Sequence, residues 1–366
     1  MDKTSIKSHI VFAAQLPPPL NGSANISERV LHLIKENDFS FQFVNMRGRG
    51  KKLSYFFSRM GKSIKACSLL IGNYSRRRST IYYISVSDGW GMLFEMIPWV
   101  LASVLAAKRI MHHHSFKYCY RRTFLMYLMQ AGGKKNIVNI MLCDFHKQSF
   151  FSIYKKSLIP SNIKVIGNEF ILEKCKSIDK AKYQEKITIG HLSNLTVAKG
   201  LKIVIQIFEF FKNDKKVVFE IAGPAMSVEV KDQLSKYMKE YPDNFKYRGP
   251  LYGEAKDDWY KGIDIFLFPT AYNAETYPLV ILEAISNKII PFTTPIGCLC
   301  EMNNSLFISD YSDYYDKAVD FIKRYAVDVE FQKICSSAIS EMEIKLKNNV
   351  IESKDVLLLQ LRSLSL

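Results

Sequence analysis

The chain has 366 residues, of which 48% are hydrophobic, and its 51 Lys and Arg outnumber 35 Asp and Glu to give a net charge of +16. This length suits two domains of ordinary size, and the many Ile, Leu, Phe and Tyr residues exclude an intrinsically disordered protein. The seven scattered cysteines show neither zinc spacing nor a secretory disulfide framework, so we expect a protein of the reducing cytoplasm.

The positive charge is confined to the first half of the chain. Residues 1–180 hold 28 Lys and Arg against 10 Asp and Glu, an excess of +18, whereas the remainder comes to −2. Anionic lipid headgroups, nucleic acid or a phosphorylated acceptor would each attract such a domain, and a surface that only keeps the chain soluble is the alternative. The exposed basic clusters expected to make the contact are Arg47, Arg49, Lys51 and Lys52, and Arg76, Arg77 and Arg78.

Short apolar runs alternate with helical patterns along the first half. The apolar run at residues 9–14 predicts a strand. It is too short for a signal sequence and lacks a small-residue cleavage site. Residues 92–107 include Glu95 and Pro98 and are too few to span a bilayer, so they predict a helix packed on a sheet. The other strands expected in this half are residues 41–44, 80–86, 109–114, 136–142 and 163–166.

A polar, weakly periodic segment at residues 167–185 predicts a linker, after which the alternation starts again. Strands are expected at residues 187–192, 217–221, 245–248, 263–268 and 289–293. Apolar strands alternating with helices predict parallel sheets covered on both faces. The fold class is therefore α/β, with two Rossmann-like doubly wound domains facing a cleft. We expect the domains at residues 1–180 and 181–345, followed by a helical tail at 346–366 that packs on the first domain.

Polar residues follow several strands of the first domain, at the edge where doubly wound sheets bind ligands. The loop that ends in Gly22 and Ser23 leads into a helix, with Ser23 as a candidate N-cap. Asp88 follows the third strand at the same edge. Three consecutive histidines, residues 112–114, end the fourth strand. Alternate side chains of a strand point to opposite faces, so at most two can share a ligand, and we predict no metal site.

The second domain places a lysine and a glycine, Lys199 and Gly200, at the start of the helix after its first strand. A cation there faces anions held by neighbouring helix ends, although a solvated lysine at a helix start is the alternative. Gly223 follows the next strand, where the absence of a side chain lets the backbone approach a ligand.

Two glutamates stand eight positions apart, with Glu275 in a loop and Glu283 in the second turn of the following helix. Pro278 falls in the first turn, where its missing N–H costs nothing. The helix is apolar on most sides, so Glu283 is predicted to be a lone carboxylate that requires hydrogen-bond donors, such as sugar hydroxyls. The alternative is that Glu283 pairs with a nearby lysine and Glu275 is a solvated loop residue.

This segment resembles the Glu, seven residues, Glu signature of retaining glycosyltransferases of family four, the "glycosyl transferases group 1", which have the GT-B fold. The resemblance implies that Glu275 and a histidine lie against the donor sugar, with His114 fitting best by position and His113 second. It implies that Glu283 accepts hydrogen bonds from the nucleotide ribose. Backbone N–H groups at the helix start would hold the diphosphate, at Thr276, Tyr277, Pro278 and Leu279.

The chain also departs from the family pattern. Tyr277 and Pro278 replace the usual Phe-Gly, which removes one backbone donor. Lys199 matches the lysine of the phosphate clamp, but Asn194 stands where the family carries an arginine. The resemblance further implies that Gly200, Gly223 and Gly22 lie beside the donor, whereas Asp88, Ser23 and His113 are expected at the acceptor.

The resemblance covers most of residues 185–305 and is looser before them. It implies a metal-independent, retaining transferase that uses a nucleotide-diphosphate sugar as co-substrate and no other cofactor. The expected acceptor is a glycan or lipid-linked molecule of bacterial surface polysaccharide assembly, such as O-antigen or capsule, at the inner face of the cell membrane. A basic nucleic-acid-binding protein is the rival, but no helix-turn-helix, zinc or aromatic RNA motif supports it. Another GT-B enzyme, such as a nucleotide-sugar epimerase or an inverting transferase, is disfavoured by the glutamate pair.

Overall fold

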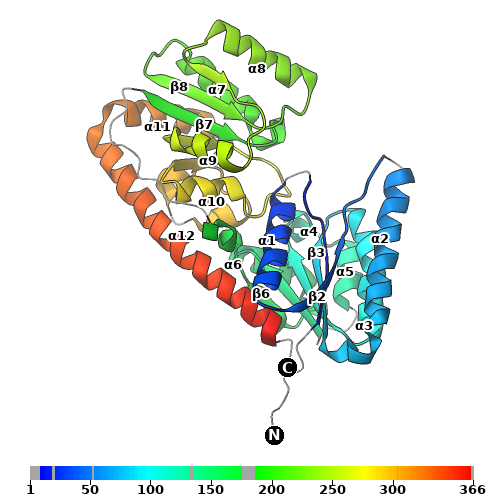
Figure 1. The fold of residues 1–366 in the computed structure, drawn as a ribbon. Helices are drawn as coiled ribbons and strands as arrows, with labels where there is room; N and C mark the ends of the chain where they lie inside the picture. Colours follow the sequence, from blue (N-terminus) through cyan, green and yellow to red (C-terminus); the bar gives the residue numbers. More distant parts are fainter. Residues whose placement is uncertain are drawn as a thin grey trace. The chain divides into compact units, whose positions relative to one another are not determined.

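The computed structural model describes residues 9–18, 21–51, 53–131, 136–174, 186–302 and 304–363. These residues group into two compact units, each built around one parallel sheet. Unit 1 comprises Met1–Ile171, Ala274–Tyr277 and Ile351–Leu366, and unit 2 comprises Leu172–Asn273 and Pro278–Val350. The α/β fold with two Rossmann-like domains is therefore as predicted, and Figure 1 shows its elements in sequence colours.

The sheet of unit 1 has six parallel strands in the order β2-β1-β3-β4-β5-β6. β1 (His9–Ala14) and β3 (Thr80–Val86) are buried along their whole length, as expected for continuous apolar runs in the middle of a covered parallel sheet. β2 at the edge is partly exposed. The other strands are β2 (Ser40–Asn45), β4 (Lys108–His113), β5 (Ile137–Met141) and β6 (Ile163–Val165). All six lie within two residues of the predicted bounds.

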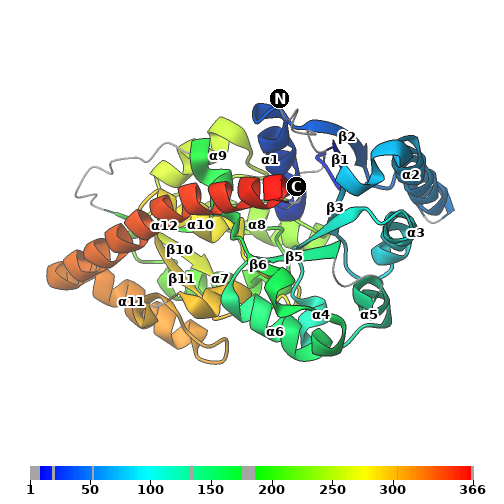
Figure 2. The same ribbon diagram turned by 90° about the horizontal axis from the view of Figure 1, so that it is seen from below.

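Helices cover both faces of this sheet. α2 (Leu53–Gly72), α3 (Gly91–Val104) and α5 (Phe124–Ala131) follow one another on one side in Figure 2, and α1 (Gly22–Glu36) and α6 (Asp144–Tyr154) lie on the other side in Figure 1. The apolar segment at 92–107 is thus a packed helix, with the indole Nε1 of Trp99 donating to the Met129 carbonyl at 2.8 Å. The short elements are α4 (Lys117–Tyr120), η1 (Tyr74–Ser79), η3 (Lys155–Ser157), η4 (Pro160–Asn162) and η5 (Asn168–Lys174). No helix within the described ranges is long and apolar enough to cross a membrane.

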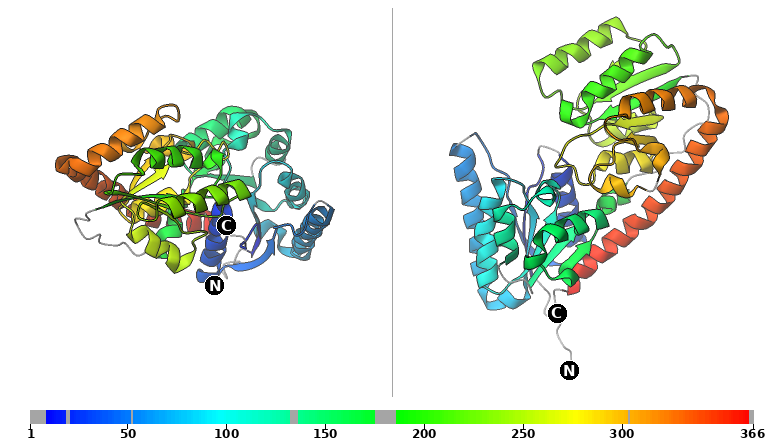
Figure 3. Two further views of the ribbon diagram at one scale, coloured as in Figure 1. Left: turned by 90° about the horizontal axis from the view of Figure 1, so that it is seen from above. Right: turned by 180° about the vertical axis from the view of Figure 1, so that it is seen from behind.

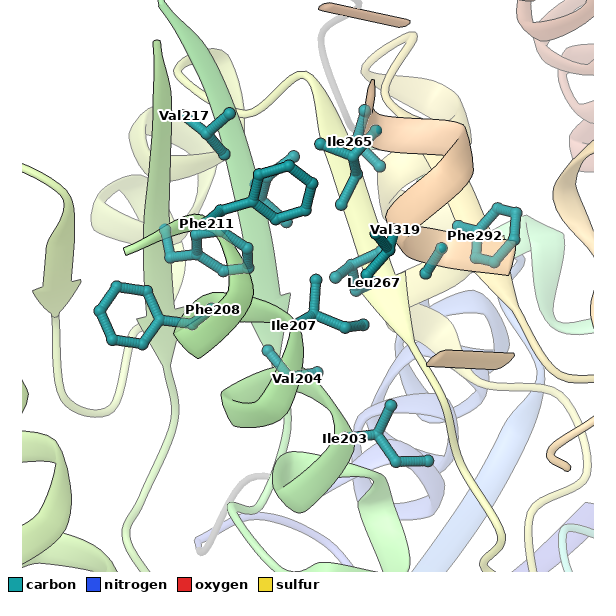
Figure 4. Close-up of a cluster of buried hydrophobic side chains, with 14 of the residues drawn as sticks. Ile203, Val204, Ile207, Phe208, Phe211, Val217, Ile265, Leu267, Phe292 and Val319 are labelled. Carbon is teal, nitrogen blue, oxygen red and sulfur yellow. The ribbon is translucent and has the colours of Figure 1, made fainter. Parts of the chain in front are cut away.

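The sheet of unit 2 has five parallel strands in the order β11-β10-β7-β8-β9. The apolar side of α7 (Leu201–Phe211) packs on it, and Figure 4 shows Ile207, Phe208 and Phe211 of this helix in one cluster with Val217, Ile265 and Leu267. Burial of these side chains is the main favourable term in folding. The strands are β7 (Ile187–Leu192), β8 (Val217–Ala222), β9 (Phe245–Tyr247), β10 (Ile265–Phe268) and β11 (Ile290–Thr293). The helices are α7 (Leu201–Phe211), α8 (Val228–Glu240), α9 (Gly253–Lys261), α10 (Leu279–Ser286) and α11 (Tyr314–Val327), with η6 (Val197–Lys199), η7 (Gly297–Glu301) and η8 (Ser305–Phe307).

Two sequence predictions about connections require correction. The predicted linker begins with η5, a 3-10 helix that buries Phe170 completely, and the units divide after Ile171 rather than after residue 180. The rest of that linker, residues 175–185, lies outside the described residues. The predicted boundary at residue 345 falls inside α12 (Val329–Ser363), a single helix drawn from orange to red in Figure 3. Its last part, from Ile351, groups with unit 1.

Candidate functional site

The order of strands reverses at β1 in the sheet of unit 1, since β1 pairs with β2 on one side and β3 on the other. Ligands of doubly wound sheets bind at the carboxyl ends of strands beside such a point. The Gln15 amide after β1 donates to the Ser87 hydroxyl after β3 at 3.0 Å, which links the two loops. The next residue, Asp88, accepts from the Ser115 hydroxyl at 3.2 Å. The structure therefore brings Asp88 together with the residues after β4.

His114 follows β4 at this edge, and its ring lies 4.1 Å from that of His112 between centroids, with the two planes tilted by 43°. Burial lowers the pKa of His114 to about 3, with the neighbouring His113 adding to the effect, so the imidazole is neutral at pH 7. Its Nε2 atom is buried and has no hydrogen-bond partner among the described residues. A neutral imidazole nitrogen of this kind can exchange a hydrogen bond with a sugar hydroxyl.

His113 belongs to the core, which corrects its prediction as an acceptor contact. Its ring is fully buried, Nδ1 contacts the Tyr118 hydroxyl at 2.9 Å, and Nε2 contacts the Asn139 side-chain oxygen at 2.9 Å. Burial lowers its pKa to about 4. With both nitrogens engaged inside unit 1, the side chain has no atom left for an acceptor. The strand alternation explains the difference from His114, since neighbouring residues face opposite ways.

The segment that contains Glu275 packs on unit 1. The Thr276 hydroxyl donates to the His114 carbonyl at 3.1 Å, and the Phe116 N–H donates to the Ala274 carbonyl at 3.4 Å. The Tyr277 hydroxyl donates to Glu169 Oε1 at 3.1 Å, and the Asn168 amide donates to the Tyr277 carbonyl at 3.4 Å. Glu275 therefore directly precedes a residue that is hydrogen-bonded to His114. Both predicted sugar-binding residues, Glu275 and His114, belong to unit 1.

The helix that follows the first strand begins differently from the prediction. Asn21, and not Ser23, is the N-cap of α1, since its side chain accepts from the Ala24 N–H at 2.9 Å. Ser23 instead donates its hydroxyl to Asn21 Oδ1 at 3.1 Å. Gly22 is the first helical residue and is exposed, as is Ser23.

The strand order of unit 2 reverses at β7, which pairs with both β8 and β10. The loop after β7 carries Lys199, whose ammonium nitrogen lies 4.7 Å from the ring centroid of Tyr272 and 5.8 Å from that of Phe268. The Ala271 N–H donates to the Ala198 carbonyl at 2.9 Å, so this loop and the loop after β10 are bonded to each other. Lys199 is therefore a cation placed at the switch point of the sheet.

Two glycines make this arrangement possible. Gly200 has φ +88°, and a Cβ there would lie 2.1 Å from the Pro269 carbonyl oxygen. Gly223 has φ +119°, and a Cβ there would lie 1.8 Å from the Ser193 carbonyl oxygen. Only glycine fits positions with both a left-handed backbone and so close an approach. Asn194 lies exposed in the same loop and supplies a polar but uncharged group where the family has an arginine.

Glu283 is not the lone carboxylate that the apolar helix predicted. Its Oε1 pairs with the Lys256 ammonium at 2.6 Å, and its Oε2 accepts from the Tyr260 hydroxyl at 3.0 Å. Both partners stand on α9, and the ion pair is largely buried, with 22% and 14% of the side chains exposed. The alternative of a lysine partner is the one that the structure shows. Each carboxylate oxygen retains a second acceptor site, so ribose hydroxyls can still bind there.

The N-terminus of α10 lies at the same edge of the sheet as Lys199. Pro278 is the N-cap and Leu279 the first helical residue, so the helix begins one residue later than predicted. The first N–H groups of a helix lack partners within it and favour anions. Nothing in the sequence indicated Lys256, Tyr260 or Tyr272, which contact the predicted site residues Glu283 and Lys199. Lys256 and Tyr260 belong to a helix with the pattern of a solvent-exposed helix, and Tyr272 is a tyrosine in a loop, and neither context marks a contact with a site residue.

No group of three or more His, Cys, Asp or Glu side chains within the described ranges is arranged to hold a metal ion. The buried histidines are instead held by aromatic neighbours: the Tyr83 hydroxyl lies 2.5 Å from His112 Nδ1, and the His146 ring stacks on Phe116. Burial also lowers the pKa values of His112 and His146 well below the usual value.

A family model described as "Glycosyl transferases group 1" matches residues 175–311, which include Lys199, Gly223, Glu275 and Glu283. Residues 175–311 are a group 1 glycosyltransferase domain. A glycogen synthase of Mycoplasma mobile is 24% identical over 203 residues, which are 55% of this chain and only 40% of that relative. The chain thus matches well under two thirds of the relative's length.

Solved structures place this glycosyltransferase domain and the residues before it in the GT-B fold. The HepE protein of Anabaena in complex with UDP superposes with a TM-score of 0.68 at 12% identity, over 97% of this chain and 100% of that one. The same protein in complex with UDP-glucose gives 0.67 at 11% identity, over 97% and 100%. A lipopolysaccharide outer core galactosyltransferase gives 0.59 at 14% identity, over 94% of this chain and 99% of that one. At such identities the likeness establishes the fold alone.

Proposed function

We propose that the protein is a retaining glycosyltransferase that moves a sugar from a nucleotide-diphosphate sugar to a hydroxyl of a glycan or lipid-linked acceptor. The observation that carries the proposal is the set of donor-binding groups at the switch point of unit 2: Lys199, the close turns at Gly200 and Gly223, and the start of α10 with Glu283 in its second turn. The crystal structures of HepE with UDP and UDP-glucose support a nucleotide-sugar donor.

The roles follow from charge and position. As the bond between the anomeric carbon and the diphosphate breaks, negative charge grows on the leaving oxygen. Lys199 and the N–H groups at the start of α10 stabilise that charge. Glu283 holds the ribose. Glu275 and the neutral His114 position the sugar, and the acceptor hydroxyl attacks the anomeric carbon beside Asp88. No side chain is assigned as a covalent nucleophile.

The proposed reaction needs no divalent metal, because a lysine and a helix N-terminus meet the charge of the leaving group. Turnover should persist in excess chelator. Loss of turnover that magnesium or manganese restores would contradict this part of the proposal. The anomeric configuration of the product, read by proton NMR, decides between retention and inversion.

The acceptor is proposed to belong to bacterial surface polysaccharide assembly, such as O-antigen or capsule, at the inner face of the cell membrane. The likeness to a lipopolysaccharide outer core galactosyltransferase and the basic first half of the chain support this proposal.

Donor binding provides the decisive experiment. Screening nucleotide sugars for thermal stabilisation identifies the donor, because a ligand of the folded state raises the melting temperature. We expect Glu283→Gln to weaken its binding by about 10- to 150-fold, since hydrogen bonds to a charged acceptor contribute about 1.5–3 kcal/mol.

A matched control separates this role from that of an ion-pair residue. Glu343 is a buried glutamate of unit 2 that pairs with Lys347, so Glu343→Gln removes a comparable charge from a different helix, α12. We expect it to leave the donor Kd unchanged. If Glu283→Gln and Lys256→Met lower the melting temperature without changing the donor Kd, Glu283 is a structural residue and its assignment to the donor is wrong.

A further inference from the structure

The helices on one side of unit 1 expose an unusual amount of apolar surface. Fourteen of the 30 large hydrophobic side chains found exposed among the described residues fall within residues 53–128. On α2 they recur on one face of the helix: Leu53 is 71% exposed, Phe57 66%, Ile64 61% and Ile71 59%. Together with the half-buried Met60 these residues form what we call the α2 stripe. Contiguous apolar surface of this kind marks an interaction site.

The stripe continues onto the neighbouring helices. α3 packs beside α2, and α5 beside α3, on the same side of the sheet (Figure 2). Exposed apolar side chains also recur at helical spacing on these two, as Ile97, Val100 and Val104 on α3 and as Phe124 and Leu128 on α5. The exposed face is therefore wider than one helix.

The sequence that contains these helices is strongly basic. Between Asp38 and Asp144 the sequence holds 17 Lys and Arg and two acidic residues, Asp88 and Glu95. Glu95 is buried and pairs with Arg59 at 3.1 Å, so it does not contribute to the surface. Burial lowers the pKa of Lys62, and the charges of Arg49, Arg59 and Arg47 add to the effect.

We propose that the α2 stripe, with the adjoining faces of α3 and α5, is the surface by which the protein enters the headgroup region of an anionic lipid bilayer. Apolar side chains that sit among lysines and arginines are typical of helices that lie in the membrane interface. A second copy of this surface is a poor partner, because pairing it with itself would bring like charges together. Nucleic acid would satisfy the cations but would leave the phenylalanine, isoleucine and leucine side chains in water.

The same helix is bonded to the proposed acceptor loop. On its buried side Arg59 donates to the Met46 and Gly91 carbonyls and to Glu95, and Glu95 accepts from the Ser87 N–H at 2.9 Å. Ser87 precedes Asp88. A helix seated in the bilayer is thereby connected to the loop that we assign to the acceptor, which suits an acceptor presented by the membrane.

Vesicle sedimentation of the full chain tests the surface. At low salt we expect binding to vesicles of phosphatidylglycerol and phosphatidylcholine, and little binding to phosphatidylcholine alone. Removing charges in Arg49→Gln with Lys65→Gln should weaken binding by about fivefold per charge, and added salt should shrink this difference.

The apolar part is tested by Phe57→Ser with Ile64→Ser, which should weaken binding to anionic vesicles at least tenfold. Val228→Ser with Ile344→Ser is the matched control, because these side chains are as exposed but lie in unit 2, and it should bind like the unchanged protein. Donor binding, measured in the same samples, reports the fold and the proposed reaction independently of the vesicles.

Four results would overturn the inference: no binding to anionic vesicles at low salt, equal binding to neutral vesicles, unchanged binding by the Phe57 and Ile64 variant, or tighter binding to DNA than to lipid. A dimer in analytical ultracentrifugation that this variant dissociates would assign the surface to a second copy instead.

Discussion

The two units share a topology but distribute their polar groups in opposite ways. Unit 1 places ionisable groups inside, with His112, His113 and His146 and the Arg59–Glu95 pair in its core, and leaves apolar side chains on its helices exposed. Unit 2 buries a single histidine, His191, and keeps its pairs at the surface or near the proposed donor site. The same fold can therefore have quite different sensitivities to pH and to substitution.

The largest expected difference is the response to acid. Burial lowers the pKa of His113 to about 4 and of His114 to about 3, and holds His112 and His146 well below the usual value, whereas the unfolded chain titrates near 6.5. The folded state then binds fewer protons than the unfolded state below pH 6.5, so acid destabilises it. Each such histidine costs about 1.4 kcal/mol per pH unit until its folded pKa is reached.

Unit 2 has only His191 to contribute, with its pKa lowered to about 4 by burial. Hydrogen exchange followed by mass spectrometry at pH 7 and 5.5, corrected for intrinsic rates, resolves the two sheets separately. We expect protection to fall more in the peptides of β3 to β5 than in those of β7 and β8. Equal losses in the two sheets would show that the buried histidines do not set the acid stability.

The next largest effect is expected at the buried ion pair of unit 1. Glu95→Ala leaves the Arg59 guanidinium buried without its carboxylate, which should cost about 3–5 kcal/mol in unfolding free energy. Urea denaturation measures this loss. The double variant Arg59→Met with Glu95→Leu removes both charges and should be less destabilised than Glu95→Ala. If the double variant is the worse of the two, the hydrogen bonds from Arg59 to the Met46 and Gly91 carbonyls matter more than the pair.

A glycine of unit 2 tests how tightly its donor loops are built. Gly223→Ala combines a left-handed backbone with a contact to the Ser193 carbonyl oxygen and should cost about 2–5 kcal/mol. Gly249 is the matched control: its φ is +68°, but a Cβ there meets no atom within 4 Å, so Gly249→Ala should cost only about 1–2 kcal/mol. Thermal melts of both variants, with donor and without it, provide the measurement. Similar losses at both positions would mean that the backbone at Gly223 can move away from Ser193.

The sequence predicted the eleven strands of the described residues. Most of them, such as β1, β3 and β8, are buried continuous apolar runs, a signal that depends only on local composition. The turn at Lys199 and Gly200 and the start of α10 could also be predicted from local sequence. The residues that contact the site residues could not. Lys256 reaches Glu283 across 27 positions, and Thr276 bonds to the His114 carbonyl across 162, and neither distance leaves a pattern in the chain.

His113 and His114 show how far a side chain's role can be predicted from its position along a strand. The strand pattern placed both at the correct sheet edge, but which of them enters the core depends on Tyr118 and Asn139, whose contacts arise only on folding. The start of the predicted tail at residue 346 was wrong for a related reason, although residues from Ile351 do group with unit 1. A helix that runs from Val329 to Ser363 carries no local signal of where it leaves one unit for the other.

The smallest expected effect is at the surface ion pair of unit 2, which sharpens the contrast with Arg59 and Glu95. Arg248 Nη2 lies 2.9 Å from Glu220 Oε1, a geometry as good as that of the buried pair, but 46% of the Arg248 side chain is exposed. Water screens the attraction and already solvates the arginine, so geometry alone does not make the pair stabilising. A double-mutant cycle with Glu220→Gln and Arg248→Gln should give a coupling of about 0.2–1 kcal/mol that falls in high salt. A coupling of several kcal/mol that salt does not reduce would show that burial is not what separates the ion pairs of the two units.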